Sequence, residues 1–137
     1  ENNIPIPRDF LHLARRILVV EKEPTVAKAI EITLRKHNFD VYMAQDGFSA
    51  GSLLREHLPS VMTIDLRVPG LGGFDVIEYV RLAPELAKTK ILVISAMDQA
   101  DLDRARLLGA DDILAKPFDP EELARRVVRL AGSDLRA

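Results

Sequence analysis

The sequence predicts an α/β fold, in which short parallel strands alternate with amphipathic helices. Two observations support this fold class: short apolar runs recur along the chain, and stretches with helical spacing of apolar residues separate them. In addition, 47% of the 137 residues are apolar, which is ordinary for one globular domain. We therefore expect a single domain over residues 15–132, with an N-terminal linker over 1–14 and a C-terminal tail over 133–137.

Five apolar runs are the predicted strands, and they occupy residues 16–20, 41–44, 61–65, 90–94 and 113–115. Four of these runs lead directly into polar side chains, namely Glu21, Asp65, Ser95 and Lys116. In an open parallel sheet, ligands bind at the edge formed by the carboxyl ends of the strands. We therefore expect an acid cluster, a hydroxyl and a lysine to converge on Asp65.

The five predicted helices begin near residues 24, 47, 74, 98 and 119. Pro24 suits the first turn of the first helix, and Asn38 suits a left-handed residue after its end. Phe48, in the second helix, is expected to be a packing residue. The last helix begins at Asp119 and Pro120. It carries two pairs with the favourable i,i+4 polarity, Glu121–Arg125 and Glu122–Arg126.

The composition excludes several classes of function. The net charge is −2, from 19 basic and 21 acidic residues that are well mixed, so we expect no direct contact with nucleic acid. The chain has no cysteine, which excludes disulfides and thiolate metal sites and suits a cytoplasmic location. No apolar run approaches the roughly 20 residues that a membrane span requires, so we expect no membrane partner.

Four segments at predicted strand ends occur in a specific order. They are Ile17-Leu18-Val19-Val20-Glu21-Lys22-Glu23-Pro24, Ile64-Asp65-Leu66-Arg67-Val68-Pro69-Gly70, Ile94-Ser95-Ala96, and Gly109-Ala110-Asp111-Asp112-Ile113-Leu114-Ala115-Lys116-Pro117-Phe118. Together they resemble the receiver domain of bacterial response regulators, and the resemblance covers about residues 16–130. It implies a doubly wound, flavodoxin-like (βα)5 fold with strand order 2-1-3-4-5, acting in two-component signal transduction.

The resemblance also implies a role for each polar residue at the strand ends. Asp65 would accept a phosphoryl group from a sensor histidine kinase or a phosphotransfer protein. Ser95 and Lys116 would contact the transferred group. Magnesium would be held by Glu21, Asp65 and the backbone carbonyl of Arg67. These roles are physically reasonable, because phosphoryl transfer depends on positioning and on neutralising the charge of the phosphoryl oxygens.

The sequence departs from the family at three positions. Glu21 is a longer carboxylate than the usual aspartate. Lys22 replaces the second acid, which is normally a direct metal ligand, so we expect magnesium binding to be weak or absent. The lysine can pair with Asp65, or it can point to solvent and leave Glu21 to support a weak site. Ile113 replaces the aromatic residue that, with the hydroxyl matching Ser95, forms the conformational switch of the family. Isoleucine cannot supply that ring.

Two smaller expectations follow from the same resemblance. The Lys116–Pro117 bond is predicted to be cis, because a tight turn at this point would aim the lysine inward, and an X–Pro linkage is the one in which cis is tolerated. The positions of Arg67 and Met97 tune the lifetime of the phosphorylated state in the family, so this lifetime would be particular to the present chain.

We therefore expect a signalling domain, not an enzyme, that is phosphorylated on Asp65 and acts on an output domain or a partner protein. The alternative is a pseudo-receiver, an interaction module that keeps the fold but has impaired magnesium binding and phosphorylation. A haloacid-dehalogenase-type phosphatase would need a second aspartate where Arg67 stands. A flavodoxin would need a phosphate loop rich in glycine and hydroxyls where the chain has Glu21-Lys22-Glu23-Pro24.

Overall fold

The fold is built on a parallel five-stranded sheet, as the sequence predicts. The computed structural model describes residues 15–96 and 98–135, so the predicted linker over 1–14 lies outside the described residues. The strands are β1 (Arg16–Val20), β2 (Asp40–Ala44), β3 (Val61–Asp65), β4 (Lys90–Ser95) and β5 (Asp112–Ala115). Their order in the sheet is β2-β1-β3-β4-β5, which confirms the predicted order 2-1-3-4-5.

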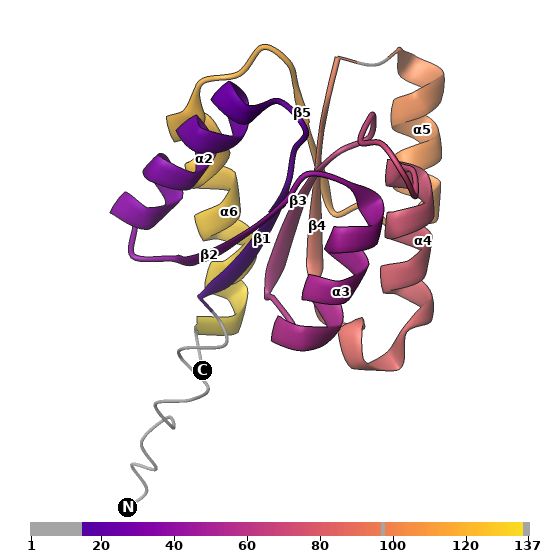
Figure 1. Cartoon of the computed structure of the whole chain (residues 1–137), viewed down its shortest axis with the longest axis horizontal. Helices are drawn as coiled ribbons and strands as arrows, with labels where there is room; N and C mark the ends of the chain where they lie inside the picture. The colour runs from indigo at the N-terminus through magenta and orange to yellow at the C-terminus, as the bar shows by residue number, and fades with distance from the viewer. Residues whose placement is uncertain (1–14, 97, 136–137) are drawn as a thin grey trace, which may run out of the picture.

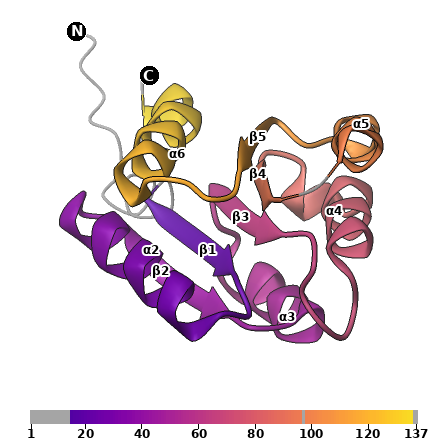
Figure 2. The same cartoon turned by 90° about the horizontal axis from the view of Figure 1, so that it is seen from above.

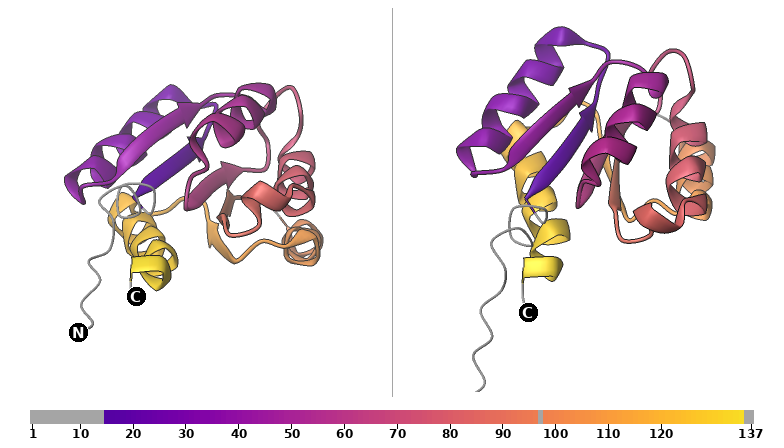
Figure 3. Two further views of the ribbon diagram at one scale, coloured as in Figure 1. Left: turned by 90° about the horizontal axis from the view of Figure 1, so that it is seen from below. Right: turned by 60° about the horizontal axis from the view of Figure 1, so that its bottom comes forward.

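Helices cover both faces of this sheet. They are α2 (Pro24–Lys36), α3 (Gly47–His57), α4 (Gly73–Leu82), α5 (Gln99–Leu108) and α6 (Pro120–Leu135), with a short 3-10 helix η1 (Pro84–Leu86) after α4. The helices α2 and α6 lie on one face, and α3, α4 and α5 lie on the other (Figures 1 and 2). Two further views show the same division (Figure 3). The last helix continues to Leu135, into the segment predicted to be a tail.

Each face of the sheet packs against its helices through a separate apolar core. Successive residues of a strand point to opposite faces, so Ile17 and Val19 join the core under α2 and α6, and Leu18 and Val20 join the other. Every residue of β3 is buried, because β3 lies in the centre of the sheet with helices on both sides. The central strands are therefore held firmly enough to fix the side chains that follow them.

The helix ends largely follow the sequence signals. Pro24 occupies the first turn of α2, and Asn38 after that helix has a φ of 66°, as predicted. The side chain of Asp46 accepts a hydrogen bond from the amide of Ser49 at 2.8 Å and so caps α3. Asp98 caps α5 in the same way. These caps fix where each helix begins relative to the strand before it.

Two expectations about side chains were wrong. The pair Glu122–Arg126 forms at 3.0 Å, but Glu121 does not pair with Arg125. It pairs with His37 at 3.1 Å instead, because α6 lies beside the end of α2. Phe48 was expected to be a packing residue, yet 68% of its surface is exposed.

No helix within residues 15–96 and 98–135 combines the length and the apolar composition that are needed to cross a bilayer.

Candidate functional site

Four polar side chains converge at the carboxyl edge of the sheet. Glu21 directly follows β1, Asp65 ends β3, Ser95 ends β4 and Lys116 directly follows β5. These four strands are neighbours in the order β1-β3-β4-β5, so their carboxyl ends adjoin one another. The sequence predicted this convergence.

Asp65 lies at the centre of the site and is nearly inaccessible, with 4% of its surface exposed. Its Oδ2 accepts a hydrogen bond from Lys116 Nζ at 2.7 Å, and its Oδ1 accepts one from the backbone amide of Arg67 at 2.9 Å. Burial of a carboxylate without partners is costly, and these two donors offset that cost. A charged carboxylate held in a fixed orientation is what a phosphoryl acceptor requires.

Glu21 is the second carboxylate of the site and is 1% exposed. Its Oε1 lies 3.1 Å from Lys116 Nζ, at an angle that does not meet hydrogen-bond geometry, so this contact is an ion pair only. Its Oε2 accepts a hydrogen bond from the backbone amide of Glu23 at 3.1 Å. Oε1 of Glu21 therefore has a cationic partner in Lys116 but no hydrogen-bond donor among the described residues.

Lys116 bridges the two buried carboxylates. Burial acts to lower the pKa of its amine, but the hydrogen bond to Asp65 and the interaction with Glu21 outweigh burial, so the pKa of Lys116 is raised above its usual value. The amine thus remains protonated at physiological pH. The Lys116–Pro117 bond is cis, as predicted from the resemblance.

Lys22 does not pair with Asp65, which corrects one of the two expectations for this residue. Its side chain is exposed, and among the described residues it has no hydrogen-bond or ion-pair partner. The cation beside Asp65 is Lys116, which approaches from β5 and occupies Oδ2. Lys22 therefore points to solvent and acts on the site only through a screened, longer-range charge.

The two predicted switch residues are buried to different degrees. Ser95 is 2% exposed, and its Oγ has no hydrogen-bond partner. Ile113 is partly buried and packs against the core under α3, α4 and α5. A buried hydroxyl without a partner is uncommon, and at a strand end beside Asp65 it can bind a ligand oxygen. Arg67 is exposed, and Met97 lies outside the described residues.

The donor atoms present suit a hydrated magnesium ion held by few protein ligands. Glu21 Oε1 lacks a hydrogen-bond donor, Asp65 supplies a second carboxylate, and both are oxygen ligands of the kind that magnesium prefers. Among the described residues, however, no group of three or more His, Cys, Asp or Glu side chains is arranged to hold a metal. Lys116 also lies between the two carboxylates. The residues thus fit a weak site rather than a tight one.

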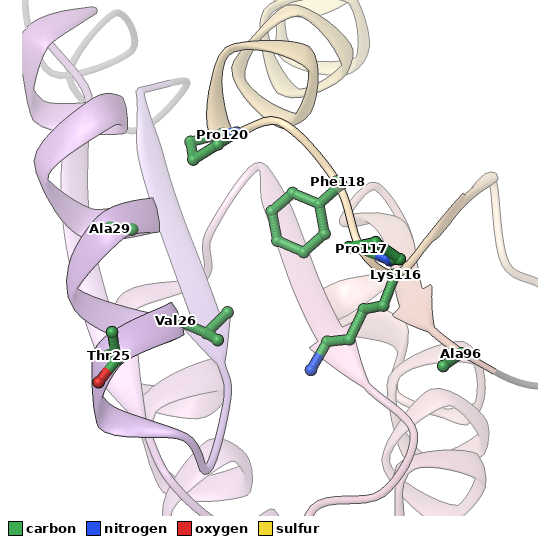
Figure 4. A pocket seen from close by; sticks show the side chains of 8 residues that line it. All are labelled: Thr25, Val26, Ala29, Ala96, Lys116, Pro117, Phe118 and Pro120. Carbon is green, nitrogen blue, oxygen red and sulfur yellow. The ribbon is translucent and has the colours of Figure 1, made fainter.

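A pocket of about 420 Å³ opens beside Lys116, between the first turns of α2 and the segment that joins β5 to α6. Its other lining residues are almost entirely apolar: Thr25, Val26, Ala29, Ala96, Pro117, Phe118 and Pro120. Figure 4 shows Val26 on α2 and Phe118 on opposite walls, with the amine of Lys116 pointing toward the strand ends. The pocket therefore gives an apolar surface next to the charged site.

The sequence profile of the response regulator receiver domain matches residues 17–128. The chain belongs to this family. A receiver domain from Bermanella marisrubri is 43% identical, with a TM-score of 0.78, over 85% of this chain and 97% of that one. The receiver domain of a signal transduction histidine kinase from Syntrophus aciditrophicus is 26% identical, with a TM-score of 0.82, over 89% of this chain and 93% of that one.

A third similar structure bears on the metal. The receiver domain of a sensor histidine kinase from Pseudomonas aeruginosa has magnesium coordinated in its active-site cleft. It is 29% identical to this chain, with a TM-score of 0.79, and the match covers 86% of this chain and 98% of that one. Receiver domains are signalling modules of two-component systems, so the phosphatase and flavodoxin alternatives have no support from these matches.

The sequence did not reveal the apolar pocket. Val26, on the inward side of α2, is only partly buried and lines the pocket with Thr25 and Ala29. Small side chains on this helix face leave a gap toward Phe118. Helical periodicity cannot distinguish a residue that fills a core from one that lines a recess, because both lie on the inward face.

Proposed function

We propose that this receiver domain accepts a phosphoryl group on Asp65 from a sensor histidine kinase or a phosphotransfer protein. The observation that supports this most strongly is the contact of Lys116 Nζ with Asp65 Oδ2 at 2.7 Å, beside a buried Ser95 hydroxyl that has no partner. An acceptor carboxylate, a fixed cation and a free hydroxyl are the groups that phosphoryl transfer requires.

In the transfer, the P–N bond of a phosphohistidine donor breaks as a P–O bond to one carboxylate oxygen of Asp65 forms. Lys116 would exchange its contact with the carboxylate for a contact with a phosphoryl oxygen and neutralise part of its charge. Ser95 would donate its hydroxyl hydrogen to another phosphoryl oxygen. The amide of Arg67 keeps the carboxylate oriented during this exchange, since it holds the second oxygen at 2.9 Å.

Glu21, Asp65 and the backbone carbonyl of Arg67 would hold magnesium in this proposal. When bound, the ion neutralises charge on the phosphoryl oxygens. The affinity would be low, because only two carboxylates are available and Lys116 already lies within 3.1 Å of both. Lys22 adds a second positive charge at the position where the family has an acid.

The proposed phosphodonor docks over the carboxyl edge and places an apolar side chain in the pocket beside Lys116. The pocket adjoins the charged site and is lined by apolar groups of α2 and of the segment before α6, so one partner surface can reach both. A phosphodonor inside the cell fits the cytoplasmic location expected from the absence of cysteine. The phosphorylated domain would then act on an output domain or a partner protein, with no direct contact to nucleic acid.

A pseudo-receiver is the second candidate, and specific observations favour it. Lys22, which is exposed and has no hydrogen-bond or ion-pair partner among the described residues, stands where a metal-ligating acid is usual in the family. Ile113 also lacks the aromatic ring of the family's switch. A domain that is not phosphorylated could still use its surface for binding.

Labelling with acetyl phosphate and magnesium distinguishes the two candidates. We expect the wild type to gain one phosphoryl group, measured as a mass increase of the intact protein, and Asp65→Asn to gain none. Chemical-shift mapping with magnesium and beryllium fluoride provides a second measurement without turnover. A wild type that remains unlabelled, and whose amides near Asp65 do not respond to beryllium fluoride, would establish the pseudo-receiver instead.

A further inference from the structure

The loop of residues 66–72, which connects β3 to α4, begins directly after Asp65. It supplies the amide of Arg67 that holds Asp65 Oδ1 at 2.9 Å, and it carries the carbonyl of Arg67 that is proposed to bind magnesium. The geometry of the acceptor therefore depends on what fixes this loop. Leu66 and Val68 anchor the loop in the core on either side of Arg67. Pro69 and Gly70 are exposed, so burial does not hold the second half of the loop in place.

The first turn of α3 contacts this loop backbone to backbone. The amide of Gly47 donates a hydrogen bond to the carbonyl of Pro69 at 3.0 Å. A Cβ atom added to Gly47 would lie only 1.8 Å from the carbonyl oxygen of Leu71, so no other residue fits at this position without displacing the loop. The beginning of α3 thus acts as a close-fitting support for residues 69–71.

Phe48 adds a second contact to the same loop. Its ring lies against Gly70, because a Cβ added to Gly70 would be 3.0 Å from Cδ2 of Phe48 and 3.2 Å from Cε2. Gly70 has a φ of 77°, a conformation that glycine adopts without strain. Phe48 is nevertheless 68% exposed, so the ring covers the loop instead of filling the core.

The helix cap before Phe48 fixes the backbone from which its ring projects. Asp46 accepts hydrogen bonds from both the amide and the hydroxyl of Ser49, at 2.8 and 3.0 Å, which fixes the first turn of α3. Because the Phe48 ring is exposed, it contributes little to the core. Its position against the loop that orients Asp65 suggests that it supports this loop instead.

We propose that Gly47 and Phe48 are positioning residues for the Asp65 site, acting through the loop of residues 66–72. They hold the loop so that the amide and the carbonyl of Arg67 stay directed at the acceptor. The expected effect on phosphorylation rests on the proposed function. The effect on the Arg67 amide does not. Neither residue touches the reacting atoms, so both act only through Arg67.

The deciding experiment compares Phe48→Ala with two other variants. Phe48→Tyr keeps the ring and should behave as the wild type. Leu82→Ala is the matched control, because Leu82 is 76% exposed and lies at the other end of α4 from the loop. Phe48 is exposed, so its truncation should leave the protein folded. Gly47→Ala is expected to have a larger effect but can fail to fold, and it is therefore a secondary variant.

The first measurement is hydrogen exchange of the Arg67 amide in protein without magnesium or phosphate. We expect protection to fall about two- to tenfold in Phe48→Ala, the range that corresponds to losing one aromatic contact. Phe48→Tyr and Leu82→Ala should retain wild-type protection. An Arg67 amide that is unchanged in Phe48→Ala, or equally changed in Leu82→Ala, overturns the proposal.

The second measurement is the rate of labelling by acetyl phosphate with magnesium, read together with the thermal unfolding midpoint. Phe48→Ala should be labelled about two- to tenfold more slowly, while its unfolding midpoint stays close to that of Leu82→Ala. Slower labelling without any change at Arg67 contradicts the positioning role. If wild type is not labelled but the Arg67 amide still responds to Phe48→Ala, the proposed function fails and the positioning role stands.

Discussion

The amino and carboxyl edges of the sheet differ in how completely their polar groups are hydrogen-bonded. At the amino edge, Asp111 Oδ2 accepts hydrogen bonds from Arg81 Nη2 at 2.6 Å and from the amide of Ile91 at 2.8 Å. Thr89 donates its hydroxyl hydrogen to the carbonyl of Pro59 at 2.8 Å, and its own carbonyl accepts from Arg81. Asp111, Thr89 and Arg81 thus have their hydrogen-bond partners within the protein.

At the carboxyl edge, some buried polar atoms have no hydrogen-bond partner within the described part of the chain. Ser95 Oγ is buried without a hydrogen-bond partner, and Glu21 Oε1 has an ion pair but no hydrogen bond. The amino edge has one comparable atom, Arg16 Nε, although that guanidinium still donates through Nη1 to the carbonyl of His57 at 3.1 Å. Thr63 Oγ1, inside β3, also lacks a hydrogen-bond partner among the described residues. Buried polar groups without hydrogen-bond partners lower stability, so the two such atoms at the carboxyl edge make it a candidate ligand site.

Lys116→Met should disrupt the site at the carboxyl edge and have the largest effect on labelling of Asp65. The methionine keeps the length of the side chain but removes the only cation in contact with Asp65 and Glu21 among the described residues. Labelling by acetyl phosphate should fall about 100- to 1000-fold, as for the loss of one charge-stabilising donor. The exposed Lys88→Met at the opposite edge is the control and should be labelled at the wild-type rate. Equal rates for both variants would remove Lys116 from the site.

Asp111→Ala should instead remove hydrogen bonds at the amino edge and lower the stability of the fold. The change removes the acceptor of Arg81 Nη2 and of the Ile91 amide, so the free energy of unfolding should fall by about 1–3 kcal/mol. Urea denaturation measures the loss, and labelling of Asp65 should stay near the wild-type rate. The control is Asp103→Ala. Asp103 accepts an exposed hydrogen bond from Gln99 Nε2 at 2.8 Å and lies 4.0 Å from Arg106 in an exposed pair, so its loss should cost only a few tenths of a kcal/mol. A marked loss of labelling in Asp111→Ala would show that the edges are coupled.

Lys22→Asp should strengthen magnesium binding at the carboxyl edge, because it restores the second acid of the family. Because Lys22 is exposed, reversing its charge changes the interaction with a nearby cation by only about 1–2 kcal/mol, or about five- to thirtyfold in magnesium affinity. Calorimetric titration with magnesium measures the gain. Lys36→Asp, at the far end of α2, makes the same change of net charge and should leave the affinity unaltered. Tight magnesium binding by the wild type would contradict this view of Lys22.

The smallest expected effect is the pH dependence of the stability that the charge of Lys116 contributes. The pKa of Lys116 is raised above 10.5 in the folded protein, since its contacts with Asp65 and Glu21 outweigh burial. Its charge therefore stabilises the fold fully below the unfolded value of 10.5, and this contribution is lost as the pH rises through the folded pKa. The stability difference between wild type and Lys116→Met should be constant at neutral pH and shrink above pH 10.5. A difference that persists unchanged in strong alkali would mean that the charge is not responsible.

Much of the site could be predicted from local patterns. Continuous apolar runs indicated the strands, and the first residue or two after each run placed Glu21, Asp65, Ser95 and Lys116 at one edge. This works because the carboxyl ends of parallel strands in one sheet adjoin one another whatever the helices do. The helix starts at Pro24 and Asp98 followed from equally local preferences of proline and aspartate.

The choice of partners among these side chains was not local. The sequence offers two lysines near Asp65, and the fold selects Lys116 because β5 aims it inward while Lys22 is exposed at the start of α2. The position of Phe48 over Gly70 depends in the same way on how α3 packs beside a loop more than 20 residues later in the chain. The sequence alone determined the strands, their polar ends and the family. Only the tertiary structure decided which charges meet, because that depends on distances between segments that are far apart along the chain.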